Sequence, residues 1–209
     1  MTRLITIRES RPRTASALFV LALSVLATGV ISGQGAASSK TQSDQANDLA
    51  GFKEFTIRVE AYVKLQKTVE SSLPGLSPTD LPELIAAHQQ ALARKIREVR
   101  PHAKAGDVFT SAACEAFRHA AHAVLEGPHS ASSRAYMQPG APNPGMRLAV
   151  NEVYPDTEPY TVVSPELLAA LPPLPAEVAY VIVGRTLILI DVQSRLIVDV
   201  ALLVLPPAS

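Results

Sequence analysis

Three side chains that can bind metal ions recur at helical spacing in the middle of the sequence. Glu115, His119 and His122 stand at positions i, i+4 and i+7, so a helix would present them as one column. Imidazole and carboxylate groups on one face bind Zn²⁺, Ni²⁺ or Co²⁺ when further ligands come from elsewhere. The column points away from the apolar side of the same helix, which is typical of a solvated face. We therefore predict no metal site, and keep these three residues as the candidates should a metal bind.

Two carboxylates near the C-terminus suggest general acid–base chemistry, which needs two carboxyl groups in different environments. Asp191 and Asp199 each lie by a turn or on the side of a strand that we expect to be exposed. Aspartate in such places assists turns and protects sheet edges. The sequence contains no Gly-x-Ser-x-Gly, His-Glu-x-x-His or phosphate-binding Gly-rich motif. We predict no catalytic residue, no cofactor and no enzymatic activity.

The remaining reactive side chains have structural interpretations. His88 falls on an apolar helix stripe, as a core or boundary histidine does, while His102 and His129 flank helix ends. Cys114 is the only cysteine, so it cannot form an internal disulfide, and we interpret it as a small packed thiol.

Residues 1–37 have the order of an export signal. Four arginines precede an uncharged apolar run over residues 15–31, and small residues follow up to Ala37. A secretion translocon recognises this order, with the positive charges on the cytoplasmic side. We predict a signal peptide cut after Ala37, with a retained membrane anchor as the alternative. The rest of the chain is then periplasmic or secreted, and it meets the membrane only through an uncleaved signal.

The charge balance argues against nucleic acid as a partner. The chain has 19 basic and 19 acidic side chains, and without the leader's four Arg and one Glu it has 15 against 18. A mildly acidic domain lacks the clustered Lys and Arg that phosphate binding requires.

The middle of the chain predicts helices. Residues 38–50 are small and polar and predict a flexible linker, and residues 51–127 form a helical region. Its first apolar stripe runs from Phe52 to Val69, a second helix starts near Asp80, and a third starts near Asp107. Short connections favour a three-helix layer of antiparallel neighbours. The Phe52–Val69 stripe is also heptad-like and suited to a partner helix. Residues 128–145 are rich in Pro and Gly and predict a loop.

Residues 146–209 predict a β-rich region. We expect strands at 146–153 and 160–163, and a short helix that starts at Ser164-Pro165-Glu166 and ends at Ala170. Strands at 178–183, 186–192 and 195–202 follow, joined by tight turns into an antiparallel meander. Residues 187–190 are apolar on both faces, so that strand should be central and covered on both sides. The fold class is α+β: a signal helix, three helices, then a small sheet.

The residues from Tyr180 through Gly184-Arg185 to Val200 resemble the C-terminal hairpin of periplasmic nickel/cobalt-homeostasis proteins. A longer stretch, from Ile96 to that hairpin, resembles an uncharacterised family of small exported bacterial proteins. The first resemblance implies metal handling in the periplasm but carries over no metal ligand. The second implies export and no known activity.

Together these features predict an exported, non-catalytic cell-envelope protein that binds or scaffolds something, possible partners being proteins. The alternative is a periplasmic protein that handles divalent metals. A hydrolase with an unrecognised site comes third.

Overall fold

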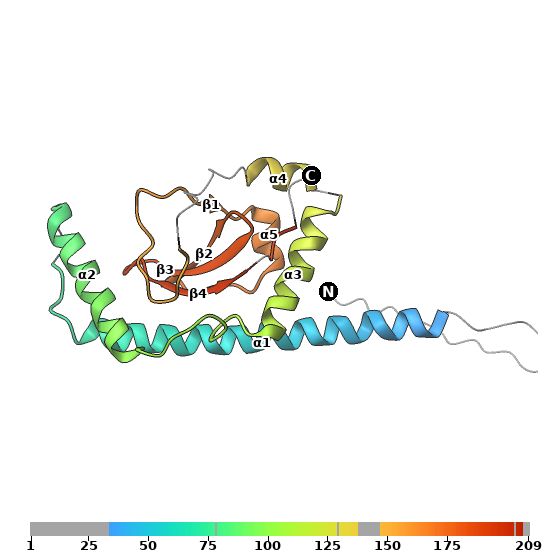
Figure 1. Ribbon diagram of the computed structural model, residues 1–209, viewed down its shortest axis with the longest axis horizontal. Coiled ribbons are helices and arrows are strands. Elements are labelled where there is room, and N and C mark those ends of the chain that lie inside the picture. The colour runs from blue at the N-terminus through green and yellow to red at the C-terminus, as the bar shows by residue number, and fades with distance from the viewer. Residues whose placement is uncertain (1–33, 78, 129, 138–146, 203, 207–209) are drawn as a thin grey trace, which may run out of the picture.

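One long helix, α1 (Gln34–Ser71), runs along one side of the molecule, and the other elements pack on its middle and its C-terminal part (Figure 1). This is a computed structural model, and it describes residues 34–77, 79–128, 130–137, 147–202 and 204–206. The order of elements is helices first and an antiparallel sheet last, so the fold class is α+β, as predicted.

Residues 38–50 differ from the prediction of a flexible linker, because they belong to α1. They contain neither Pro nor Gly, so nothing interrupts a helix that is already formed by the buried stripe downstream. Ala37, the predicted cleavage position, lies in the first turn of α1. The apolar run lies outside the described residues, and cleavage stays a prediction.

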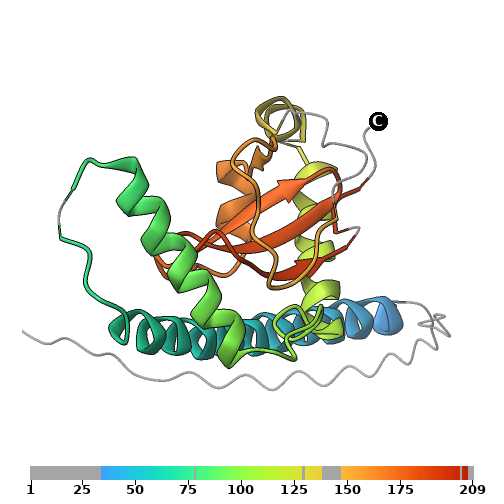
Figure 2. The same cartoon turned by 60° about the vertical axis from the view of Figure 1, so that its left-hand side comes forward.

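Two further helices pack on α1 at separate places. The helix α3 (Ser111–Leu125) crosses α1 near Gly51, where a side-chain Cβ would lie 2.6 Å from the carbonyl oxygen of Ala112. The C-terminal half of the helix α2 (Pro82–Val99) contacts α1, and the N-terminal half of α2 lies away from α1 (Figure 2). The predicted layer of antiparallel neighbours is therefore replaced by two separate crossings. The Phe52–Val69 stripe packs inside this chain: Phe52 is partly buried, and the stripe is buried from Phe55 to Val69.

The segment between helices and sheet is less regular than predicted. A helix, α4 (Ser130–Tyr136), forms within the predicted loop 128–145. The strand expected at 146–153 is wrong for the described residues, which turn and form one isolated bridge between Val153 and Leu196. Asn151 explains the turn, since its φ of 67° lies in the left-handed region that Asn tolerates.

The C-terminal meander is confirmed. The strands β1 (Thr161–Val162), β2 (Val178–Val183), β3 (Thr186–Asp191) and β4 (Ile197–Ala201) pair antiparallel in sequence order, with α5 (Pro165–Ala170) between the first two. Every residue of β3 is buried, as expected for a strand covered on both faces. Gly184 has a φ of 62° in the β2–β3 turn, which fits the predicted two-residue hairpin.

The core has two parts, one on each face of the sheet. The helix-facing part joins α1, α2 and α3 to Leu187 and Leu189, while the smaller part packs Tyr154 on Ile188 and Ile190. Although the chain is poor in aromatic residues, its centre is aromatic. Four of the five Phe residues and Tyr180 lie in edge and stacked contacts with ring centroids 4.8–6.0 Å apart: Phe52, Phe55, Phe109 and Phe117.

The central position of β3 predicts unequal costs for the same substitution. Leu189 is fully buried and Leu202 is 63% exposed. We expect Leu189→Ala to lower the free energy of unfolding by about 2–5 kcal/mol, because it leaves a cavity. Leu202→Ala, the matched control, should change it by less than about 0.5 kcal/mol. Urea denaturation measures both, and equal midpoints for the two variants would contradict the assignment of β3 as the centre.

Candidate functional site

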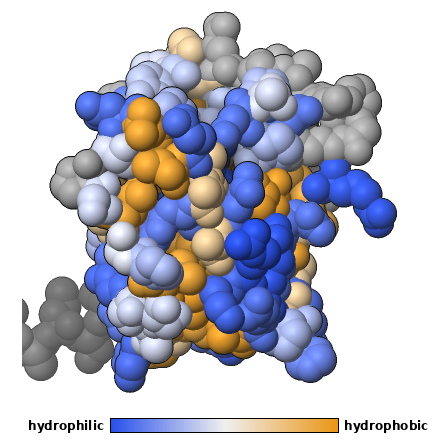
Figure 3. Space-filling view, turned by 90° about the vertical axis from the view of Figure 1, so that its left-hand side faces the viewer, coloured by the Kyte–Doolittle hydropathy of each residue, from blue (hydrophilic) through white to orange (hydrophobic). Residues whose placement is uncertain are grey.

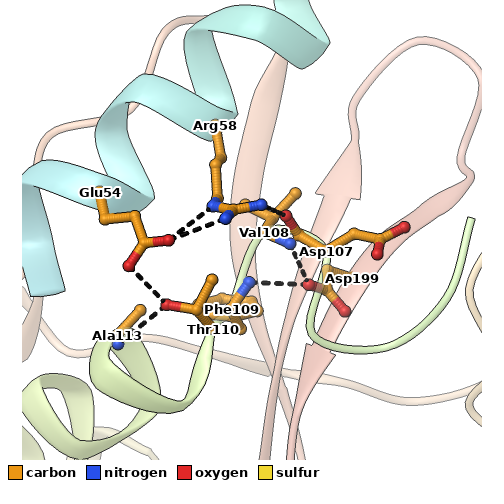
Figure 4. A network of polar contacts seen from close by, with 8 residues as sticks. All are labelled: Glu54, Arg58, Asp107, Val108, Phe109, Thr110, Ala113 and Asp199. Carbon is orange, nitrogen blue, oxygen red and sulfur yellow. Dashed lines mark hydrogen bonds and ion pairs between the residues drawn. The ribbon is translucent and has the colours of Figure 1, made fainter.

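The carboxylate of Asp199 is the most heavily bonded polar group in the described part of the chain. It is fully buried on β4 and accepts hydrogen bonds from the backbone N–H groups of Gly106 (3.0 Å), Val108 (2.6 Å) and Phe109 (2.7 Å). Its own neighbour, Val200, donates a fourth at 2.7 Å. Figure 4 shows the carboxylate facing the loop that connects α2 to α3. The arrangement fixes that loop against the sheet.

A β-bulge turns Asp199 inward. Leu189 pairs with Asp199 and Ile190 pairs with Ile197, so Val198 is the extra residue of β4. A bulge interrupts the alternation of faces. Asp199 thereby shares the helix-facing side with Leu189, instead of the exposed side that we predicted. The prediction of exposure is wrong for this residue.

A second, half-exposed network adjoins the first (Figure 4). Thr110 is the N-cap of α3, with its hydroxyl accepting from the N–H of Ala113, and the same hydroxyl donates to Glu54 at 3.1 Å. Arg58 forms an ion pair with Glu54 at 2.8 Å and donates to the carbonyl oxygen of Asp107. Hydrogen bonds from Arg58 and Thr110 hold the pKa of Glu54 below its ordinary value. The network ties α1 to the start of α3.

Asp191 forms a separate buried cluster at the end of β3. Its carboxylate accepts from the hydroxyl of Tyr62 at 2.7 Å and from the N–H groups of Gln193 and Ser194. The guanidinium of Arg100 lies 4.9 Å from the centre of the Tyr62 ring. Burial, and then the charge of Asp191, raise the pKa of Tyr62 above its ordinary value. Sequence patterns identify the aspartate and miss Tyr62, whose partner lies 129 residues away.

Both aspartates are fully buried. The prediction of a position by a turn is confirmed for Asp191, whose carboxylate accepts from the N–H groups of Gln193 and Ser194. The prediction of an exposed strand position is wrong for Asp199. Each accepts at least three hydrogen bonds from the protein itself. A carboxylate whose oxygens accept bonds from the protein in this way supports the fold. A general acid or base, in contrast, needs access to substrate, which these two buried groups lack. We assign Asp191 and Asp199 structural roles.

The three candidate metal ligands lie exposed on α3, and each pairs with a different residue. Glu115 forms an ion pair with Arg118 at 2.5 Å, and His122 contacts Glu126 at 2.7 Å. His119 lies 2.8 Å from Asp48 of α1, a contact that links two helices and that spacing alone does not reveal. Across the described residues, no cluster of three or more His, Cys, Asp or Glu side chains is arranged to hold a metal ion.

The other reactive residues have the structural settings of packed or surface groups. Cys114 is half-buried, and its thiol donates to the carbonyl oxygen of Phe109. Burial, followed by the charge of Asp199, raises the pKa of this thiol, which keeps it protonated. His88 is half-buried on α2, His102 is exposed, and His129 lies outside the described residues.

The comparisons with known proteins identify no relative. No family model matches the chain, and neither a curated protein nor a solved structure is similar to it. Among the helices that the structure describes, none has a stretch long and apolar enough to cross a membrane. The resemblances stated for the hairpin and for the longer stretch therefore stay predictions.

The pair formed by Tyr62 and Asp191 predicts a loss of stability in alkali. Because the folded-state pKa of Tyr62 is raised, the folded protein keeps the phenol proton that the unfolded chain releases. The stabilisation is complete below the unfolded pKa of about 10 and decreases above it, by up to about 1.4 kcal/mol per pH unit. We expect Tyr62→Phe to be less stable at pH 7, by about 1–3 kcal/mol, and to lose part of the alkaline slope.

Denaturant titrations between pH 8 and 11 measure this slope. Tyr136→Phe is the matched control, since Tyr136 is 58% exposed on α4. Identical slopes for Tyr62→Phe and the wild type would contradict the account of this pair.

Proposed function

We propose that this chain is an exported, non-catalytic protein of the cell envelope that binds or scaffolds another protein. Export rests on the sequence of residues 1–37, which lie mostly outside the described residues. The non-catalytic character is supported by the buried carboxylates, whose oxygens bind the protein's own donors. The binding role rests on one observation, the unpaired apolar surface of α2.

The apolar stripe of α2 is buried along its C-terminal half and exposed along its N-terminal half. Ile85, Leu92 and Ile96 project to the same side of the helix, since they are separated by seven and four residues. Leu81 is the N-cap residue directly before it. In the C-terminal half, Leu92 and Ile96 are fully buried in the core. In the N-terminal half, Leu84 and Ile85 are 45% and 38% exposed, and the N-cap residue Leu81 is 52% exposed. We call Leu81, Leu84 and Ile85 the α2 patch.

The α2 patch continues an existing helix–helix contact. The C-terminal half of α2 packs on α1, and the patch extends the same side beyond α1, where the two helices have diverged (Figure 2). Figure 3 views the α2 end of the molecule, where hydrophobic side chains lie among hydrophilic ones. Apolar patches with a polar rim are typical of protein interaction sites. The partner that fits is an apolar or amphipathic helix of another envelope protein.

A divalent-metal-handling protein remains the second candidate, and it rests on the contact of His119 with Asp48 beside His122. A titration with Ni²⁺, Co²⁺ or Zn²⁺ decides it, because only a real site would lose binding in the His119→Ala, His122→Ala double variant. The hydrolase is the third candidate, and no described contact supports it.

The α2 patch predicts a position-specific crosslink. A photoreactive amino acid in place of Leu84, in cells that make the protein, should yield one discrete adduct with a second polypeptide. Leu168 of α5 is also 45% exposed and is the matched control position, which should yield no such adduct. In a second experiment the photoreactive amino acid replaces Leu81. Adding Leu84→Glu to that variant should abolish its adduct. Leu84→Glu should also keep the melting temperature within about 2 °C of the wild type, because the Leu84 side chain is at the surface.

Two results would contradict the proposal. One is the absence of any adduct from position 84. The other is an adduct that forms equally from positions 84 and 168. Fractionation of the same cells tests export, since a protein recovered only with the cytoplasm would contradict that part of the proposal.

A further inference from the structure

A second surface, on α1, has features that the α2 patch lacks. The buried stripe of α1 faces the core, and the opposite side of the helix is exposed over about seven turns. Two large apolar side chains project from this outer face, Leu49 at 72% exposure and Ile57 at 56%. Four charged residues accompany them on this side of the helix: Lys53, Glu60, Lys64 and Lys67. Lys67 forms an ion pair with Glu177.

Two hollows lie along α1 on either side of Ile57. One, of about 600 Å³, extends from Ala46 to Thr56, and the other, of about 550 Å³, extends from Glu60 to Ser71. Both are bordered by the segment that follows α5, through Pro172 and Pro175 respectively. Hollows of this size accept side chains of a partner.

One pair of opposite charges on this face is arranged symmetrically about its centre. Lys53 and Glu60 are equally distant from the point midway between Thr56 and Ile57, about 5 Å along the axis in each direction. Both side chains are exposed, and within the described part of the chain neither has an ion-pair partner. If a second copy of α1 lies antiparallel against this face, Lys53 of each helix therefore lies opposite Glu60 of the other.

We propose that two copies of this chain pair through the outer faces of α1, antiparallel, about a twofold axis between Thr56 and Ile57. Lys53 of one protomer then faces the partner's Glu60, and its own Glu60 faces the partner's Lys53. Leu49 reaches the level of the partner's Lys64, where it enters the 550 Å³ hollow that Val63 and Thr68 also line. A twofold interface uses the same patch on both copies, as this geometry requires.

A second copy fits better than an unrelated partner because the face carries both signs of charge. A uniformly acidic or anionic partner would meet Glu60, and a basic one would meet Lys53 and Lys64. One helix face buries less than the roughly 800 Å² per partner of a standard stable interface. The dimer is therefore reversible and depends on concentration. This inference uses α1, and it is independent of the partner proposed for the α2 patch.

Charge reversal with rescue tests the dimer. Sedimentation velocity is run on the full chain, as recovered from the cells that make it, over a wide concentration range. We expect Lys53→Glu and Glu60→Lys each to weaken dimerisation about tenfold or more, because each places like charges at two symmetric contacts. The double variant Lys53→Glu, Glu60→Lys restores the opposite charges in exchanged positions and should dimerise within about threefold of the wild type.

The control is Lys104→Glu, which makes the same charge change at an exposed position in the α2–α3 connection and should leave dimerisation unchanged. Thermal melting checks that all variants stay folded, as expected for exposed side chains without ion pairs. A wild-type protein that stays monomeric at every concentration would overturn the proposal. Single variants that dimerise like the wild type, or a folded double variant that fails to recover, would overturn it as well.

Discussion

The Asp199 carboxylate is the constraint on which the arrangement of the helices depends. Four backbone N–H groups converge on it, and three of them belong to the connection between α2 and α3. Those bonds hold Val108 and Phe109 in the core, and Thr110 directly after them caps α3. A buried carboxylate is costly unless it is fully bonded, and the loop supplies the donors that offset this cost. The sheet therefore determines where α3 begins, and α3 in turn packs on α1.

The sequence predicted the sheet well because its signals are local. Runs of β-branched residues, tight turns and a two-sided apolar strand define β2, β3 and β4 without reference to the rest of the chain. It failed at Asp199 because the bulge at Val198 shifts the alternation of faces by one residue, and no residue type marks the bulge. It also missed that α2 diverges from α1, since an apolar stripe does not reveal what covers it. The partners of Asp191 and His119 were missed because Tyr62 and Asp48 are distant in sequence.

The remaining surfaces suggest how the molecule acts. The inner stripe of α1 and the apolar side of the C-terminal half of α2 are buried in the core, whereas the α2 patch and the outer face of α1 are exposed. These two surfaces lie on different helices, so the two proposed contacts, with a second copy through α1 and with another protein through α2, use separate surfaces. In the assembly proposed above, the sheet and its buried aspartates would keep the two helices in place.

Amide hydrogen exchange in Asp199→Asn tests the central role of this carboxylate most directly. The amide keeps one acceptor oxygen, and its NH₂ group faces two of the four N–H donors with no change in size. Asp107→Asn is the matched control, because the Asp107 carboxylate accepts one bond, from the N–H of Lys104. We predict that Asp199→Asn lowers the free energy of unfolding by about 2–5 kcal/mol and speeds exchange at Gly106, Val108 or Phe109. Wild-type stability and protection in Asp199→Asn would contradict the account.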